Sequence, residues 1–114
     1  MYTEATQFLG KTVTVTMNRP LGSKHPKHGY TYPVNYGFLP ETKSPDGEEL
    51  DVYVLGIDAP LKQFTGQCIA FIHRLNDDDD KLIVVPEGMT LSDDEIRQAT
   101  HFQEQYFQSV IVRN

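Results

Sequence analysis

The carboxylate side chains of this sequence are concentrated in two short segments. Residues 46–51 read Asp-Gly-Glu-Glu-Leu-Asp, and residues 76–81 read Asn-Asp-Asp-Asp-Asp-Lys. Carboxylate oxygens are the ligands that hard cations such as Mg²⁺ prefer, and carboxylates that are forced together are relieved by a bound cation. The two segments therefore indicate a divalent-metal site if they lie side by side. Taken alone, each segment also has the composition of an exposed acidic turn.

Positive charge is concentrated in a different part of the chain. The segment 19–28 has no acid and contains Arg19, Lys24, His25, Lys27 and His28. Separate acidic and basic clusters favour a site for a metal together with an anion, although two solvated loops would have the same composition. The net charge of −6 argues against nucleic acid as a partner, because phosphate backbones require a basic surface.

Several short strands are expected to position these segments. In residues 11–18 the apolar Val13, Val15 and Met17 alternate with polar side chains, which is typical of a half-buried strand. Similar strands are expected at 50–56, 67–75 and 81–85, with the aspartates in a hairpin-like connection between the last two. Residues 32–39 are expected to be extended, and residues 109–112 are a candidate for a short closing strand.

One helix is expected near the C-terminus, beginning near Ser92. Ser92 and Glu95 match the capping-box pattern, in which each residue satisfies a backbone N–H of the other. The spacing of apolar residues predicts one packing face, made of Ile96, Ala99, Phe102 and Tyr106. Strands followed by a late helix indicate an antiparallel barrel or curled sheet with a helix beside it.

The bulk properties limit the class of protein. The length of 114 residues fits one domain, residues 1–114, and no apolar run approaches the ~20 residues that span a membrane. No membrane partner is therefore expected. No signal peptide is expected either, because residues 1–10 have neither a basic patch nor an apolar core. Cys68 is the one cysteine, so it has no internal disulfide partner, which suits a reducing compartment such as the cytoplasm. Its apolar surroundings favour a core residue over a nucleophile.

The order of these motifs resembles a known family. Residues 32–38, Tyr-Pro-Val-Asn-Tyr-Gly-Phe, followed shortly by residues 46–51, are similar to the signature region of the family I soluble inorganic pyrophosphatases. The acidic motif of that family usually reads Asp-Gly-Asp-Pro-x-Asp. Asp77, Asp79 and Lys81 resemble its later acidic segment.

The resemblance extends from about Thr12 to Tyr106, since His101 and Phe102 are similar to the family's C-terminal helix. It implies an α+β fold by content, with a five-stranded, OB-like antiparallel β-barrel and one C-terminal α-helix packed beside it.

The resemblance also implies an activity, namely Mg²⁺-dependent hydrolysis of inorganic pyrophosphate to two phosphates by metal-activated water, with Mn²⁺ as an alternative ion. Pyrophosphate is the implied small-molecule partner, and a homo-oligomer is one expected assembly because family members commonly assemble. The implied metal ligands are Asp46, Asp51, Asp77 and Asp79. The implied catalytic residues are Glu48, Tyr36 and Lys81. The candidates for phosphate contacts are Lys27, Lys24, Tyr106 and Arg74.

Some of these assignments have structural alternatives. Tyr36 could be a core residue, and Lys81 could form a surface pair with Asp80. The sequence offers Lys24 as well as Lys27 for one position. The compressed loop likewise leaves the choice between Asp79 and Asp80 open.

The chain also departs from the family pattern. Asn18 replaces a glutamate, Phe107 replaces a lysine, and a shortened hairpin omits an arginine that holds phosphate. Glu48 is one methylene longer than the aspartate it replaces, and a misplacement of about 1 Å can cost about 100-fold in rate. Two other functions are therefore considered: hydrolysis of another phosphoanhydride or phosphoester, and an inactive member that binds phosphate or a protein.

Overall fold

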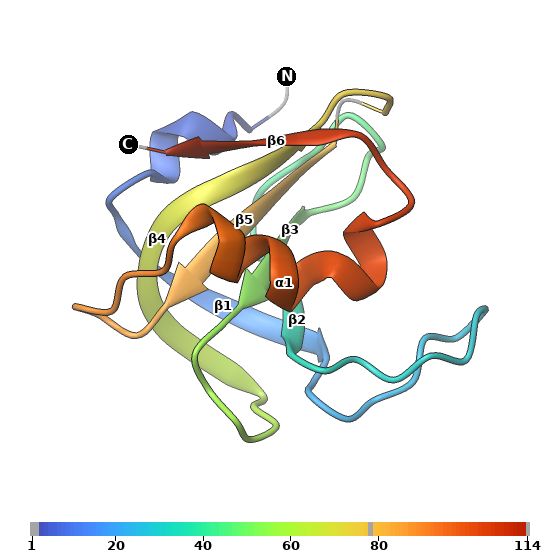
Figure 1. Ribbon diagram of the computed structural model, residues 1–114. Coiled ribbons are helices and arrows are strands. Elements are labelled where there is room, and N and C mark those ends of the chain that lie inside the picture. The colour runs from blue at the N-terminus through green and yellow to red at the C-terminus, as the bar shows by residue number, and fades with distance from the viewer. Residues whose placement is uncertain (1–2, 78, 114) are drawn as a thin grey trace.

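The computed structural model describes residues 3–77 and 79–113. The elements in chain order are η1 (Ala5–Phe8), β1 (Thr12–Arg19), β2 (Asn35–Leu39), β3 (Leu50–Val54), β4 (Gln63–Arg74), β5 (Asp80–Val85), α1 (Asp93–Glu104) and β6 (Ser109–Arg113). In Figure 1, α1 lies across the outside of the curved sheet, and the long connection between β1 and β2 extends away from it.

Strands β1 to β5 close into a barrel. The order β1-β2-β3-β5-β4 is completed by a further pairing between β4 and β1. The expected five-stranded, OB-like barrel with one C-terminal helix is confirmed. The expectation that the barrel is antiparallel throughout is wrong at one pairing, because β3 and β5 run parallel. A closed ring with an odd number of strands cannot alternate direction at every pairing, so at least one parallel pairing is required.

Strand β4 closes the ring because it pairs with different partners along its length. Its first part pairs with β1, and its second part pairs with β5 and with β6, which lies outside the barrel. The pairing of β4 with β5 has a register shift between Cys68 and Ala70, close to the point where β4 leaves β1 and begins to pair with β6. The strand begins at Gln63, before the expected residue 67, since the apolar alternation that identifies a strand is weak in its first residues.

The interior of the barrel is filled by one face of each strand. Val13, Val15 and Met17 are buried as their alternation predicts, and Val52 and Val54 of β3 join them. Asp51 and Tyr53 lie on the opposite, outer face of β3, as expected from the same alternation. The interior also contains Cys68, and burial raises the pKa of its thiol to about 11, which confirms a core role.

Strand β1 approaches β2 very closely at Gly37. A Cβ atom at this position would lie 2.2 Å from the carbonyl oxygen of Thr16. Glycine is therefore required here by the contact between the two backbones and not by an unusual φ angle.

Helix α1 packs on the outer face of the barrel. Its N-terminus has the expected capping box: the Ser92 hydroxyl accepts from the Glu95 N–H, and the Glu95 carboxylate accepts from the Ser92 N–H. Ile96 and Phe102 join a second apolar cluster with outward-facing side chains of the barrel. The prediction that Tyr106 belongs to this packing face is wrong, because the helix ends at Glu104 and the Tyr106 side chain is 68% exposed.

The basic connection between β1 and β2 forms an irregular hairpin. The N–H of Tyr32 donates to the Ser23 carbonyl, and the N–H of His25 donates to the Tyr30 carbonyl, each at 2.8 Å. Gly29 has a φ of 72°, which allows the reversal at its tip.

In the described part of the chain, none of the helices combines the length and apolar character that crossing a membrane would require.

Candidate active site

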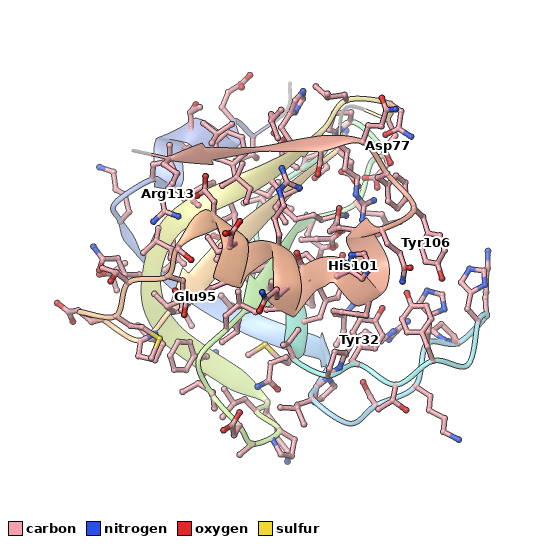
Figure 2. The ribbon with its side chains drawn as sticks, viewed as in Figure 1. Tyr32, Asp77, Glu95, His101, Tyr106 and Arg113 are labelled. Carbon is pink, nitrogen blue, oxygen red and sulfur yellow. The ribbon has the colours of Figure 1, made fainter. Side chains whose placement is uncertain are left out.

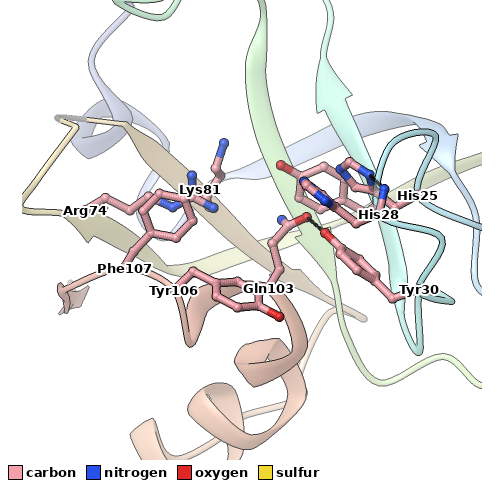
Figure 3. Close-up of a pocket in the computed structure, with 9 residues that line it drawn as sticks. His25, His28, Tyr30, Arg74, Lys81, Gln103, Tyr106 and Phe107 are labelled. Carbon is pink, nitrogen blue, oxygen red and sulfur yellow. Dashed lines mark hydrogen bonds between the residues drawn. The ribbon is translucent and has the colours of Figure 1, made fainter.

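A pocket of about 650 Å³ opens between the end of α1, the basic hairpin and the outer face of the barrel (Figure 3). It is lined by His25, His28, Tyr30, Tyr36, Arg74, Lys81, Gln103, Tyr106 and Phe107. In Figure 3, Arg74, Lys81 and Phe107 lie on one side of the pocket, and His25, His28 and Tyr30 lie on the other. The predicted Tyr36, Lys81, Arg74 and Tyr106 are therefore brought together.

Arg74 is a buried cation whose guanidinium is held by a carboxylate of the helix. Its Nε and Nη2 donate to Glu104 at 2.9 and 2.7 Å, and the side chain is only 7% exposed. Burial alone would disfavour the charge, but Glu104 outweighs burial and raises the pKa of Arg74. The third nitrogen, Nη1, lies 3.5 Å from Asp77 and 3.9 Å from Asp79.

Glu104 also connects Arg74 to a network of phenols. The hydroxyl of Tyr53 donates to Glu104 Oε2 at 2.6 Å, and Gln103 Nε2 donates to the Tyr53 oxygen at 2.8 Å. The hydroxyls of Tyr30 and Tyr32 both donate to Gln103 Oε1. The last turn of α1 is thus fixed to the barrel and to the basic hairpin by satisfied polar contacts.

Lys81 lies between two of the predicted metal ligands. Its Nζ donates to Asp51 and, at 2.7 Å, to Asp79. Burial opposes its charge, but the two carboxylates outweigh burial and raise the pKa of Lys81. The alternative of a surface pair with Asp80 is wrong: Lys81 is buried, and Asp80 contacts Nδ1 of His73 at 2.7 Å instead.

Tyr36 is both a core residue and a wall of the pocket. It is 8% exposed, and its ring lies edge-on to that of Tyr53 with centroids 4.9 Å apart. Burial, and then the negative charge of Asp51, raise the pKa of Tyr36 well above its usual value. The phenol is therefore a neutral hydrogen-bond donor near neutral pH.

The first acidic segment contributes less to the cluster than expected. Asp46 and Glu48 lie exposed on the turn before β3, where Asp46 Oδ1 accepts from the Glu48 N–H at 2.9 Å. Neither side chain lines the pocket, whereas Asp51, which starts the outer face of β3, reaches Lys81.

The basic hairpin presents histidines to the pocket in place of lysines. Lys24 and Lys27 are exposed and are not among the residues that line the pocket. His25 and His28 line it because His25 Nδ1 accepts from the backbone N–H groups of Lys27 and His28, at 3.1 and 3.2 Å. This turn places both imidazoles on the pocket side and leaves the lysines in solvent.

Two aromatic residues follow α1 at the edge of the pocket. Figure 2 shows Tyr106 beside the end of the helix, on the side where the basic hairpin lies. The centre of the Phe107 ring lies 3.7 Å from the guanidinium carbon of Arg74. This position therefore contributes a ring that covers Arg74 and no additional positive charge.

The charges around Arg74 and Lys81 do not balance. Among the described residues, these two cations are in contact with four carboxylates, those of Asp51, Asp77, Asp79 and Glu104. Four carboxylates against two cations leave a surplus of two negative charges. The same described residues hold no group of three possible ligand side chains close enough to enclose a metal ion.

The sequence from residue 11 to residue 111 matches the family model described as inorganic pyrophosphatase. The chain belongs to the inorganic pyrophosphatase family. A curated relative, the inorganic pyrophosphatase of Saccharolobus solfataricus, is 41% identical to this pyrophosphatase-family chain over 63 residues. The match covers 52% of this chain and 37% of that protein, so the chain spans well under half the length of this relative.

Solved structures of the family share the fold. The inorganic pyrophosphatase from Ehrlichia chaffeensis has a TM-score of 0.67 at 20% identity, covering 89% of this chain and 84% of that one. The enzyme from Neisseria gonorrhoeae has a TM-score of 0.64 at 25% identity, covering 85% and 74%. The pyrophosphatase-family resemblance and its barrel are thereby confirmed.

Several residues that line or support the pocket were not predicted from the sequence. Glu104 is the largest omission, although a signal was present: Ile96, Thr100 and Glu104 follow one another at intervals of four, which places all three on the buried face. Gln103 carried no comparable signal, because its position depends on the docking of the helix. His25 and His28 were recognised only as members of the basic segment 19–28, because which of its side chains face the pocket depends on the hairpin.

Proposed function

We propose that this chain hydrolyses inorganic pyrophosphate to two phosphates in a Mg²⁺-dependent reaction. The observation that carries the proposal is the charge imbalance around Lys81 and Arg74. Two cations are in place to bind an anion, yet the surplus carboxylates repel it unless a divalent cation accompanies it. Pyrophosphate with Mg²⁺ meets this requirement, and membership of the family supports pyrophosphate as the anion.

The donor set suits Mg²⁺ bound jointly with substrate. Mg²⁺ is usually held by one or two carboxylates, with waters and substrate phosphates completing its coordination. Asp51 and Asp79 fit, because both accept from one ammonium group and so lie next to each other. Asp77 and Asp46 are proposed as further ligands. When bound, Mg²⁺ would neutralise phosphate charge and acidify a coordinated water.

The side chains of the chain itself would bind and orient the phosphates. Lys81 has three donor hydrogens and uses two, so one is free for a phosphate oxygen. Arg74 Nη1 is the part of the guanidinium not committed to Glu104, and Tyr36 supplies a neutral phenol. Tyr106 would contact phosphate from the mouth of the pocket. Lys24 and Lys27 would add positive charge near its entrance.

We assign the orientation of the attacking water to Glu48. It lies on the turn that leads directly into Asp51, and Asp46 holds that turn through the Glu48 N–H. The water oxygen forms a bond to one phosphorus, and the bond from that phosphorus to the bridging oxygen breaks. The bridging oxygen leaves with the electron pair on the second phosphate.

The test is phosphate release from pyrophosphate with Mg²⁺, with Mn²⁺ and with EDTA. Turnover is expected with Mg²⁺, is expected to persist with Mn²⁺, and is expected to cease with EDTA. Asp51→Asn should remove it, whereas Glu87→Gln, an exposed carboxylate outside the pocket, should retain it. Background turnover of pyrophosphate by the folded chain would refute the proposal. Binding of Mg²⁺ and phosphate without turnover would then identify an inactive, phosphate-binding member of the family.

A further inference from the structure

The side of the pocket away from Lys81 and Arg74 is walled by aromatic rings (Figure 3). The ring centroid of His25 lies 4.7 Å from that of His28 and 4.9 Å from that of Tyr30. The rings of His28 and Tyr30 are almost parallel, with an angle of 7° between their planes. Pyrophosphate has no planar apolar surface, so these rings have no counterpart in that substrate.

The size of the pocket also suggests a ligand with an organic group. Its volume of about 650 Å³ lies within the range of about 300–1,000 Å³ that is typical of pockets for organic ligands. Two phosphate groups at Lys81 and Arg74 would therefore leave space beside the aromatic wall, and an organic group attached to the phosphates could occupy it.

Two rings of the aromatic wall, those of Tyr30 and His25, are held in place by contacts within the chain. The Tyr30 hydroxyl donates to Gln103 at 2.9 Å, and the Tyr30 ring lies edge-on to Phe102 with centroids 5.9 Å apart. His25 is held through Nδ1 by two backbone N–H groups. A surface that is already ordered loses little conformational entropy on binding, so stacking on it contributes more of its energy to affinity.

His25 is better suited to stacking than to binding phosphate as a cation. Burial, and then the neighbouring charges of His28, Arg19 and Lys27, lower the pKa of its imidazole. The neutral ring accepts from the Lys27 and His28 N–H groups through Nδ1, which requires an unprotonated nitrogen at that position.

We propose that the pocket binds a nucleoside diphosphate, with its base stacked on the wall formed by His28 and Tyr30 and its phosphates at Lys81 and Arg74. The terminal phosphate is released by the hydrolytic groups described above, so this half of the proposal rests on the proposed function. The water oxygen bonds to the terminal phosphorus, the bond from that phosphorus to the bridging oxygen breaks, and the bridging oxygen keeps the electron pair. The products are a nucleoside monophosphate, phosphate and one proton released to solvent.

The experiment compares two ligands that differ only in the base. The affinities of ADP and of ribose 5-diphosphate are measured by calorimetry with Mg²⁺ on the full chain, and phosphate release is followed from each and from pyrophosphate. ADP is expected to bind about 5- to 150-fold more tightly, the range that stacking of one base on aromatic side chains provides. Equal affinities would overturn the base site, whatever the result with pyrophosphate.

Variants separate stacking on the aromatic ring of His28 from polar contacts of its nitrogens. His28→Ala and Tyr30→Leu are expected to bring the affinity ratio of the two ligands towards one, while His28→Phe and Tyr30→Phe retain it. An equal loss in His28→Phe and His28→Ala would show that the imidazole contacts phosphate, which contradicts stacking. Phosphate release from pyrophosphate but not from ADP would overturn the nucleotide hydrolysis and leave the proposed function standing. A preserved ADP preference without turnover of pyrophosphate would refute the proposed function and support the base site.

Discussion

The guanidinium of Arg74 and the carboxylate of Glu104 form a two-pronged ion pair beneath the pocket, joining β4 to the last turn of α1. The contacts are 2.9 Å from Nε to Oε1 and 2.7 Å from Nη2 to Oε2, and the two side chains are 7% and 5% exposed. The position of α1 on the barrel and the direction of Nη1 in the pocket are therefore set by the same contact.

Removing the carboxylate of this pair should destabilise the fold strongly. Glu104→Leu leaves a buried guanidinium with only Asp77 and Asp79 near it, and breaking a buried pair from one side costs about 3–5 kcal/mol. We expect the lower end of this range, measured by urea unfolding. Arg113→Gln breaks an exposed pair with Asp93 and should cost about 1 kcal/mol or less. Equal losses in the two variants would contradict the role of Glu104.

Removing the ammonium of Lys81 should make the site depend more on metal. In Lys81→Met the carboxylates of Asp51 and Asp79 face each other without the cation that separates them. Thermal unfolding should therefore shift upward on addition of Mg²⁺ by more in this variant than in the unaltered chain. Lys62→Met, which changes an exposed lysine, is the control. An identical Mg²⁺ response in all three proteins would show that these carboxylates do not bind the ion.

Buried phenols should make the fold sensitive to alkaline pH. Burial, and then Tyr30, raise the pKa of Tyr32 to about 12, and burial raises the pKa of Tyr36 and Tyr53 well above the usual value. Phenols in the unfolded chain ionise at about pH 10. The stabilisation that comes from keeping these phenols neutral in the fold is therefore fully present below that pH, and it is lost as the pH rises towards and beyond 12. The free energy of unfolding should fall from about pH 9 to about pH 11.5.

The accompanying measurement is the absorbance of phenolate, followed in parallel with circular dichroism. Tyr36→Phe should make the alkaline loss of stability less steep, since one raised pKa is removed. A free energy of unfolding that stays constant across this pH interval would contradict the burial of these hydroxyls.

A methyl group at Gly37 should separate β1 from β2. The added Cβ would lie 2.2 Å from the Thr16 oxygen, so both backbones must move, and we expect a loss of about 3 kcal/mol or more in urea unfolding. Gly88→Ala is the matched control: its φ of +86° is strained for alanine, but the added atom has open space, so about 1–2 kcal/mol is expected. A milder effect at Gly37 than at Gly88 would contradict the close approach.

The strands and the helix were predictable because their signals are local. The alternation in β1 indicates directly which side chains are buried, and Ser92 with Glu95 marks the start of α1 within four residues of chain. The parallel contact between β3 and β5 has no such signal. It follows from closure of the ring, which involves all five strands.

The site was predictable where a residue belongs to a regular strand. Asp51 lies on the outer face of β3 that alternation identifies, and the structure brings it together with Lys81 of β5. Lys27 and Glu48 lie on a loop and a turn, where neighbouring residues point in unrelated directions. Their roles stay predictions, and the histidines of the same loop occupy the pocket.

Asp51 and Lys81 are direct neighbours in the register of the parallel pairing. A shift of β5 by a single residue would turn Lys81 into the apolar interior and place Leu82 against Asp51 outside. One inserted or deleted residue within β5 would thus remove the contact between Asp51 and Lys81 and disrupt the core packing at once. Changes in length can instead be absorbed by the connections on either side of the strand. Divergence by insertion in chains of this kind should therefore be concentrated in those connections.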